Sequence, residues 1–282
     1  MRNLIFIGFL SAALFGCNGV FFIPYRAHVQ TPKQLGLAYE DVQFQAGDGT
    51  PLHAWFLPAV GKAQGTILFL HGNAENISTH IMSVRWLPPR GFNLFLLDYR
   101  GYGASGGAAS LSGVQDDMDA ALRTLLARKD VDPNRVVVLG QSLGGSIAIH
   151  NVARSPYRQH IRALVVESAF ASYRQIAREK LADFWLTWPL QWPLSWTVSD
   201  AYNPSASVSG VSPIPLLIIH GDRDSIVPVD HGKRLFELAQ EPKQIWIVSA
   251  GGHIQAFQHQ SYRDRFVNYL TAVLPKPPAV HK

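Results

Sequence analysis

The chain has 282 residues, of which 47% are hydrophobic, 11% aromatic and only 16% charged. This composition supports a large buried core and excludes a disordered chain, a collagen-like fibre and a coiled coil. The formal net charge is +5, but the basic residues are scattered, so no nucleic-acid partner is expected. The only cysteine, Cys17, excludes an internal disulfide and a metal site built from several cysteines.

The N-terminus has the layout of an export signal. Arg2 precedes an apolar stretch over residues 4–15, and Gly16 stands before Cys17. The ending Leu-Phe-Gly-Cys resembles the cleavage box of bacterial lipoproteins, in which the cysteine becomes the lipid-bearing first residue of the mature protein. An uncleaved membrane anchor over residues 4–23 and an ordinary signal peptide are the alternatives.

Beyond this segment, short apolar runs alternate with longer amphipathic stretches, which is the pattern of parallel strands joined by helices. Six runs are hydrophobic almost throughout, as strands buried on both faces are: residues 65–70, 92–97, 136–139, 163–166, 216–219 and 245–248. Before them, residues 39–46 and 52–57 flank Gly-Asp-Gly and predict an antiparallel hairpin. The sequence therefore predicts an α/β fold with a mostly parallel sheet of eight strands.

Helices are predicted between these strands and are expected to cover both faces of the sheet. Their expected ranges are residues 77–87, 111–128, 144–153, 173–181, 230–239 and 255–274.

The strand at residues 136–139 runs directly into Gly140-Gln-Ser142-Leu-Gly144, which precedes a predicted helix. A G-x-S-x-G between a buried strand and a helix is the pattern of a nucleophile elbow, where two glycines permit a tight turn that exposes the serine hydroxyl. Ser142 is therefore the candidate nucleophile. The alternative is an ordinary turn in which this serine only caps the helix.

A serine hydroxyl needs a base to take its proton, and the base needs an acid to fix its tautomer. Both residue types follow later strands in the order expected. The block His-Gly-Asp-Arg-Asp at residues 220–224 offers Asp222 and Asp224 as acids, and His253 follows the next strand after two glycines. His259 is a rival base, although it falls within a predicted helix.

Five blocks in this order resemble the α/β-hydrolase superfamily, closest to exported and membrane-associated serine hydrolases with a His-Gly-Asn-Ala loop. The resemblance covers about residues 42–274, and its blocks are residues 71–74, 98–103, 140–144, 220–228 and 252–253. It implies that Asp224 orients His253 and that the main-chain N–H of Asn73 joins the N–H of Leu143 in an oxyanion hole. It also implies hydrolysis of carboxyl esters or thioesters through an acyl-enzyme, without metal or cofactor.

Two further patterns have structural interpretations. Gly101 to Gly106 is formally G-x-G-x-x-G, but more glycines prolong the loop before a helix can begin, so we expect a loop and no dinucleotide. His71 and His220, each before a glycine at a strand end, are expected to hold loops through hydrogen bonds.

The segment between the fourth and fifth apolar runs is expected to form a short cap at about residues 170–213. It is rich in tryptophan, and we expect these rings mainly to pack the cap onto the sheet, with Trp185, Trp188 and Trp192 also lining the substrate pocket. A surface that dips into a lipid interface is the alternative. The expected substrate is a small molecule with an apolar acyl ester.

The two resemblances together divide the chain and place it in the cell. The expected parts are a lipoprotein-type signal peptide at residues 1–16, a tether at 17–34, one hydrolase domain at 35–274 and a tail at 275–282. We expect an exported monomer, anchored by lipid on Cys17 in the bacterial envelope, and Asn18 favours the outer membrane. A peptidase or lactonase on the same fold, and a non-catalytic binding lipoprotein of the envelope, are the alternative functions.

Overall fold

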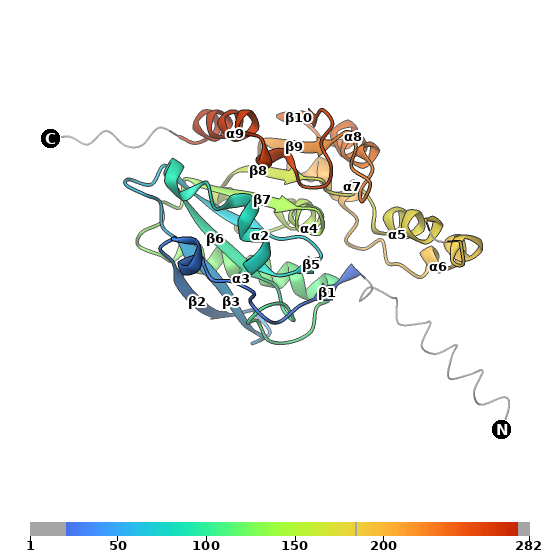
Figure 1. Cartoon of the computed structure of the whole chain (residues 1–282), viewed down its shortest axis with the longest axis horizontal. Coiled ribbons are helices and arrows are strands. Elements are labelled where there is room, and N and C mark those ends of the chain that lie inside the picture. Colours follow the sequence, from blue (N-terminus) through green and yellow to red (C-terminus); the bar gives the residue numbers. More distant parts are fainter. Residues whose placement is uncertain (1–20, 184, 276–282) are drawn as a thin grey trace, which may run out of the picture.

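The computed structural model describes residues 21–183 and 185–275 (Figure 1). Its centre is an eight-stranded sheet in the order β10-β9-β8-β7-β4-β6-β3-β2, which confirms the predicted strand number. The strands are β2 (Glu40–Gln45), β3 (Pro51–Leu57), β4 (Gly65–Leu70), β6 (Phe92–Asp98), β7 (Val136–Gln141), β8 (Ile161–Glu167), β9 (Leu216–Gly221) and β10 (Lys243–Val248). The predicted hairpin is β2–β3; β3 runs antiparallel to β6, and all other pairs are parallel.

The central strands are buried at every position, which explains their continuous hydrophobicity. In β4, β6 and β7 no residue is more than slightly exposed. Because neighbouring parallel strands end at the same edge of a sheet, the loops after β7, β8, β9 and β10 meet there.

Helices pack on both faces of the sheet, as predicted (Figure 1). On one face lie α3, α4 and α8, which contribute Val114, Ile147 and Leu235 to one core cluster; on the other, α2 and α9 contribute Ile81 and Phe266 to a second. The helices are α2 (Ile77–Val84), α3 (Leu111–Leu126), α4 (Leu143–Val152), α5 (Tyr173–Ala182), α6 (Gln191–Trp196), α7 (Pro204–Ser207), α8 (Val229–Leu238) and α9 (Gln260–Val273). None of these described helices combines the length and the hydrophobicity that a bilayer crossing needs.

Short 3-10 turns complete the connections between these elements. They are η2 (Pro32–Leu35), η3 (Pro88–Arg90), η4 (Arg158–His160), η5 (Trp188–Leu190), η6 (Val208–Val211) and η7 (Ala256–Gln258). The helix predicted over residues 255–274 is interrupted at His259, where the backbone is extended between η7 and α9.

The segment predicted as a tether, residues 17–34, packs against the domain throughout its described part. Strand β1 (Ile23–Pro24) pairs in parallel with β5 (Ala74–Glu75) as a small second sheet. The Asn76 side chain donates hydrogen bonds of 2.9 and 2.8 Å to the carbonyls of Tyr25 and Ala27. Single hydrogen bonds of this kind leave no hydrophobic period in the sequence, which is why this docking was not predicted.

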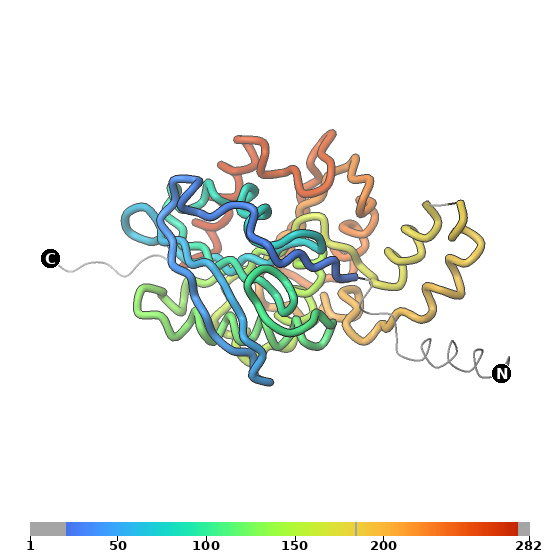
Figure 2. Tube along the Cα trace, turned by 60° about the horizontal axis from the view of Figure 1, so that its bottom comes forward, coloured from blue at the N-terminus to red at the C-terminus, as the bar shows by residue number. Residues whose placement is uncertain are grey.

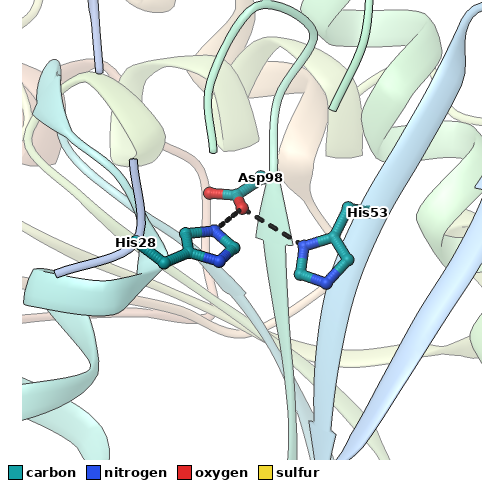
Figure 3. A group of neighbouring side chains, drawn as sticks. All are labelled: His28, His53 and Asp98. Atoms are coloured by element: carbon teal, nitrogen blue, oxygen red, sulfur yellow. Dashed lines mark hydrogen bonds and ion pairs between the residues drawn. The ribbon is translucent and has the colours of Figure 1, made fainter. Parts of the chain in front are cut away.

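A buried carboxylate fastens the same segment to the sheet (Figure 3). His28 Nε2 donates to Asp98 Oδ2 at 2.8 Å, and His53 Nδ1 donates to the same oxygen at 3.3 Å. The other oxygen accepts the N–H of Ile77 at 3.1 Å. These three side chains are near enough to share a metal ion, but both nitrogens already point at one carboxylate oxygen. They therefore form a hydrogen-bond network between residues 28, 53 and 98.

The charges in this network shift two pKa values. Burial raises the pKa of Asp98, but hydrogen bonds from His28 and His53 outweigh it and hold the pKa well below its ordinary 3.8. Burial lowers the pKa of His53, while hydrogen bonds to Asp98 and Asp41 raise it above 6.5. The Asp98 contribution is thus lost as pH falls below 3.8, and the His53 contribution is lost as pH rises through its folded pKa.

We expect Asp98→Asn to lower the free energy of unfolding by about 3 kcal/mol, because it leaves two histidine N–H groups without their buried carboxylate. The difference in unfolding free energy from the wild type should be largest at about pH 5 to 6. At lower pH the Asp98 contribution is lost, and at higher pH the His53 contribution is lost. Urea denaturation at several pH values measures it. Asp116→Asn, at an exposed position, is the matched control, and equal losses in the two variants would contradict the assignment.

Candidate active site

Ser142 lies in a strained turn between β7 and α4. Its backbone is in the left-handed region, with φ 53° and ψ −118°. The flanking glycines explain how the turn closes: a Cβ at Gly144 would lie 2.2 Å from the Leu70 carbonyl oxygen, and one at Gly140 would lie 2.5 Å from the Gly144 oxygen. The local geometry is that of a nucleophile elbow.

A histidine and a carboxylate meet in the loops after the neighbouring strands β9 and β10. His253 Nδ1 donates a 2.8 Å hydrogen bond to Asp224 Oδ2. The other oxygen of Asp224 accepts the N–H groups of Ile226 and Val227, both at 2.9 Å. Burial raises the pKa of Asp224, but the hydrogen bond and charge of His253 and these N–H groups hold it below 3.8. The ionised carboxylate keeps the proton of neutral His253 on Nδ1 and leaves Nε2 to accept one.

The rival residues lie elsewhere. Asp222 is exposed, whereas Asp224 is buried at the base of the histidine loop. His259 is exposed at the start of α9. The structure therefore brings together Asp224 and His253, out of the four candidates for acid and base.

Ser142 lies on a cavity of about 480 Å³ together with Asn73 and Leu143. His253 lines a neighbouring pocket of about 330 Å³. Within the described residues no hydrogen bond joins the Ser142 hydroxyl to His253, and such bonds in ligand-free enzymes commonly tighten only with substrate. Ser142 therefore lines one cavity together with the expected oxyanion residues. His253, with its hydrogen bond to Asp224, lines the other pocket.

Glu167, which the sequence analysis missed, links these two halves. Its carbonyl accepts the Ser142 N–H at 2.8 Å, and its carboxylate accepts the Ala256 N–H at 2.9 Å and the Gln141 side chain at 2.7 Å. Burial raises the pKa of this carboxyl above 4.5. The adjacent Ser168, at φ 54°, accepts the N–H of Ile254. An acid directly after the apolar run at residues 163–166 was the available sequence signal.

The two expected oxyanion donors face the same cavity. Tyr102 donates its hydroxyl to the Asn73 carbonyl at 2.6 Å, and the Ile23 N–H binds the Asn73 side chain at 2.9 Å, so this loop is held from two sides. In the described part of the chain, the main-chain N–H groups of Asn73 and Leu143 donate no hydrogen bond. Both are therefore free to meet a substrate oxygen.

The cavity wall is mostly apolar and does not contain the expected tryptophans. Its apolar lining is Phe21, Phe170, Ile176, Ala177, Leu181, Leu194, Val198, Ile226 and Val227. Trp185, Trp188 and Trp192 were predicted to line the pocket and pack the cap, and this is wrong: they are 76%, 61% and 52% exposed. Trp185 lies in a turn, Trp188 in η5 and Trp192 in α6, and all three side chains are exposed.

The remaining patterns have the expected structural roles. Gly101 donates its N–H to the Gly106 carbonyl at 2.7 Å, and the loop continues to Ser110, so no helix begins among the glycines. His71 Nδ1 donates to the next carbonyl at 2.7 Å, and His220 Nε2 donates to the Val227 carbonyl at 2.8 Å. Burial lowers the pKa of His71 to about 3, which keeps its ring neutral.

A mostly parallel eight-stranded sheet, helices on both faces and a strained serine turn at the carboxyl edge define the class of this protein as an α/β hydrolase. The family model described as Serine aminopeptidase, S33, matches residues 61–210, and the chain belongs to this family of hydrolases.

Relatives and solved structures agree with this assignment. The chain is 38% identical to the uncharacterized protein YfhR of Escherichia coli K12, over 83% of this chain and 81% of YfhR. It is 35% identical to the α/β-hydrolase domain-containing protein WAV2 of Arabidopsis thaliana, over 76% and 71%. The esterase Pf2001 of Pyrococcus furiosus shares the fold, with a TM-score of 0.71 and 21% identity over 90% of this chain and 97% of the esterase.

Proposed function

We propose that this hydrolase cleaves carboxyl esters or thioesters with Ser142 as nucleophile, His253 as general base and Asp224 as the residue that orients it. Two observations support the proposal: the strained serine at an apolar cavity, and the histidine of a second pocket whose Nδ1 is held by a buried carboxylate. Metal and cofactor have no part in this proposal.

In the proposed reaction, the Ser142 oxygen attacks the substrate carbonyl carbon while its proton passes to His253 Nε2. The carbonyl oxygen becomes negative and accepts hydrogen bonds from the N–H groups of Asn73 and Leu143. The C–O or C–S bond then breaks, and His253 returns the proton to the departing alcohol or thiol. A water molecule repeats the sequence on the acyl-enzyme, releasing the acid and restoring the serine.

The cavity favours an apolar acyl group. Among the described lining residues the only charged side chain is Lys180, and ten others are apolar. The family description raises peptide hydrolysis as a second candidate. An aminopeptidase binds a substrate ammonium group, for which a carboxylate is the natural partner, and this lining offers none. We therefore favour the ester or thioester over the peptide.

A fluorophosphonate probe and a substrate panel test the proposal. We expect the probe to label the peptide that contains Ser142, and kcat/KM for p-nitrophenyl esters to rise at least about tenfold from acetate to octanoate as methylenes are buried. Acyl thioesters should also be cleaved, and aminoacyl amides should not. Failure of the probe to label the folded protein would favour the binding-lipoprotein alternative, and faster cleavage of amides would favour the peptidase.

We also propose that the protein is an exported monomer with a lipid-bearing Cys17, held in the bacterial outer membrane. The support is the sequence alone, because residues 1–20 lie outside the described structure. In cells fed an alkyne analogue of palmitate, we expect labelling of the wild type and none of Cys17→Ser. Ser11→Ala is the control. Equal labelling of Cys17→Ser would contradict the anchor.

A further inference from the structure

The cap has an exposed apolar surface. Seven large side chains within residues 185–196 are between 43% and 76% exposed, and we call them the cap face: Trp185, Leu186, Trp188, Leu190, Trp192, Leu194 and Trp196. The cap elements α5, η5 and α6 project to one side of the sheet (Figures 1 and 2). So much exposed apolar area on one short segment marks an interaction surface.

The chemistry of the cap face matches a lipid surface. We propose that it docks the protein onto a phospholipid bilayer. Residues 185–196 contain no charged side chain, so they offer no charge pattern by which a folded protein or a nucleic acid would be recognised. Four of the chain's seven tryptophans lie here, and tryptophan is the side chain that favours the boundary between lipid and water. The Arg178 guanidinium lies 4.4 Å over the Trp192 ring, at the edge where lipid phosphates would lie.

The start of the described chain supports the same orientation. Phe21 lies against Tyr173, the first residue of α5, with ring centroids 5.1 Å apart. Cys17, the residue proposed to carry lipid, is joined to the domain at this point, four residues upstream. Four residues span at most about 14 Å. A lipid chain on Cys17 inserted in a bilayer would therefore keep the cap close to the same bilayer.

The cap face is continuous with the substrate cavity. Leu194 is 43% exposed on the cap face and also lines the cavity, and so does the exposed Ile226 beside it. Resting on the proposed function, this continuity lets an ester dissolved in the bilayer reach Ser142 along an apolar path.

Quenching of tryptophan fluorescence tests the docking with the full chain. Vesicles of phosphatidylcholine are prepared with plain or brominated acyl chains, since bromine quenches only rings that contact the lipid. Trp55 and Trp246 are buried inside the domain, and the four cap tryptophans are exposed. We expect brominated vesicles to remove roughly half of the emission. Equal emission in the two kinds of vesicle, with the protein bound to both, would overturn the proposal.

A charged variant separates cap docking from insertion of the N-terminal segment. Leu186→Asp with Leu190→Asp keeps all seven tryptophans and should lose most of the quenching, because two carboxylates must leave water to enter the boundary. Val60→Asp with Met82→Asp, at exposed apolar positions outside the cap, should be quenched like the wild type.

Two outcomes in this comparison would count against a lipid partner. Undiminished quenching of the cap variant would overturn the docking. So would a dimer without lipid, seen by light scattering, that the cap variant dissociates, because the face would then bind a second copy. No substrate is used, so a failure here is distinct from a failure of the proposed hydrolysis.

Discussion

Replacing Ser142 with alanine is expected to lower kcat for ester hydrolysis by about 10⁴ or more, as in other enzymes with a serine nucleophile. The reason is that alanine removes the attacking oxygen but leaves the fold, the cavity and the N–H groups of Asn73 and Leu143 in place. KM should change little, because the apolar wall that binds the acyl chain is intact. Initial rates with a p-nitrophenyl ester measure the effect.

Two controls make this result specific. Ser112→Ala, at an exposed serine on α3, should keep the full rate. The melting temperature of Ser142→Ala should stay close to that of the wild type, because alanine keeps the same backbone conformation and the change removes only one side-chain oxygen. Ester hydrolysis near the wild-type rate in Ser142→Ala would refute the assignment of the nucleophile.

Asp224→Asn is expected to lower kcat by roughly 10⁴ with little effect on the fold. An amide at this position can donate a hydrogen bond to His253 Nδ1, which then holds the proton on Nε2, where the base must be free to accept one. The carboxylate also stabilises the imidazolium formed during attack, and a neutral amide cannot. Rates measured at saturating ester, together with a urea denaturation curve, separate this effect from unfolding.

Asp222→Asn is the matched control, because it makes the same change two residues earlier in the same loop. Asp222 is exposed, whereas Asp224 holds both His253 and two backbone N–H groups. We expect Asp222→Asn to retain nearly the full rate. Similar losses in both variants would mean that the loop as a whole, and not the Asp224 carboxylate, supports the reaction.

Much of the fold could be predicted because buried parallel strands leave a strong pattern. The strand predicted at residues 65–70 coincides with β4. Every residue in it is buried, and the residues immediately before and after it are polar. The elbow was recognisable for a similar reason. Backbone contacts as short as those around Gly144 admit no side chain, so the glycines have to appear in the sequence.

Other features depend on individual tertiary contacts, which leave no periodic pattern in the sequence. The direction of the tryptophan rings could not be read from the sequence, because these residues lie in a turn and two short helices, and no pattern in the sequence shows what packs against them. The same holds for residues 21–34, which are joined to the domain by individual polar contacts such as those of Asn76 and Asp98. Glu167 was missed because a buried acid is recognised only through its partners.

The docking of residues 21–34 sets where a recombinant form of the enzyme can begin. Phe21 forms part of the cavity wall, and the Ile23 N–H holds the Asn73 side chain. A shortened protein that starts at residue 35, the boundary suggested by sequence, would lose both and would also leave Asp98 without His28. Secreted or soluble versions intended for crystallisation should therefore keep the chain from residue 21 onward.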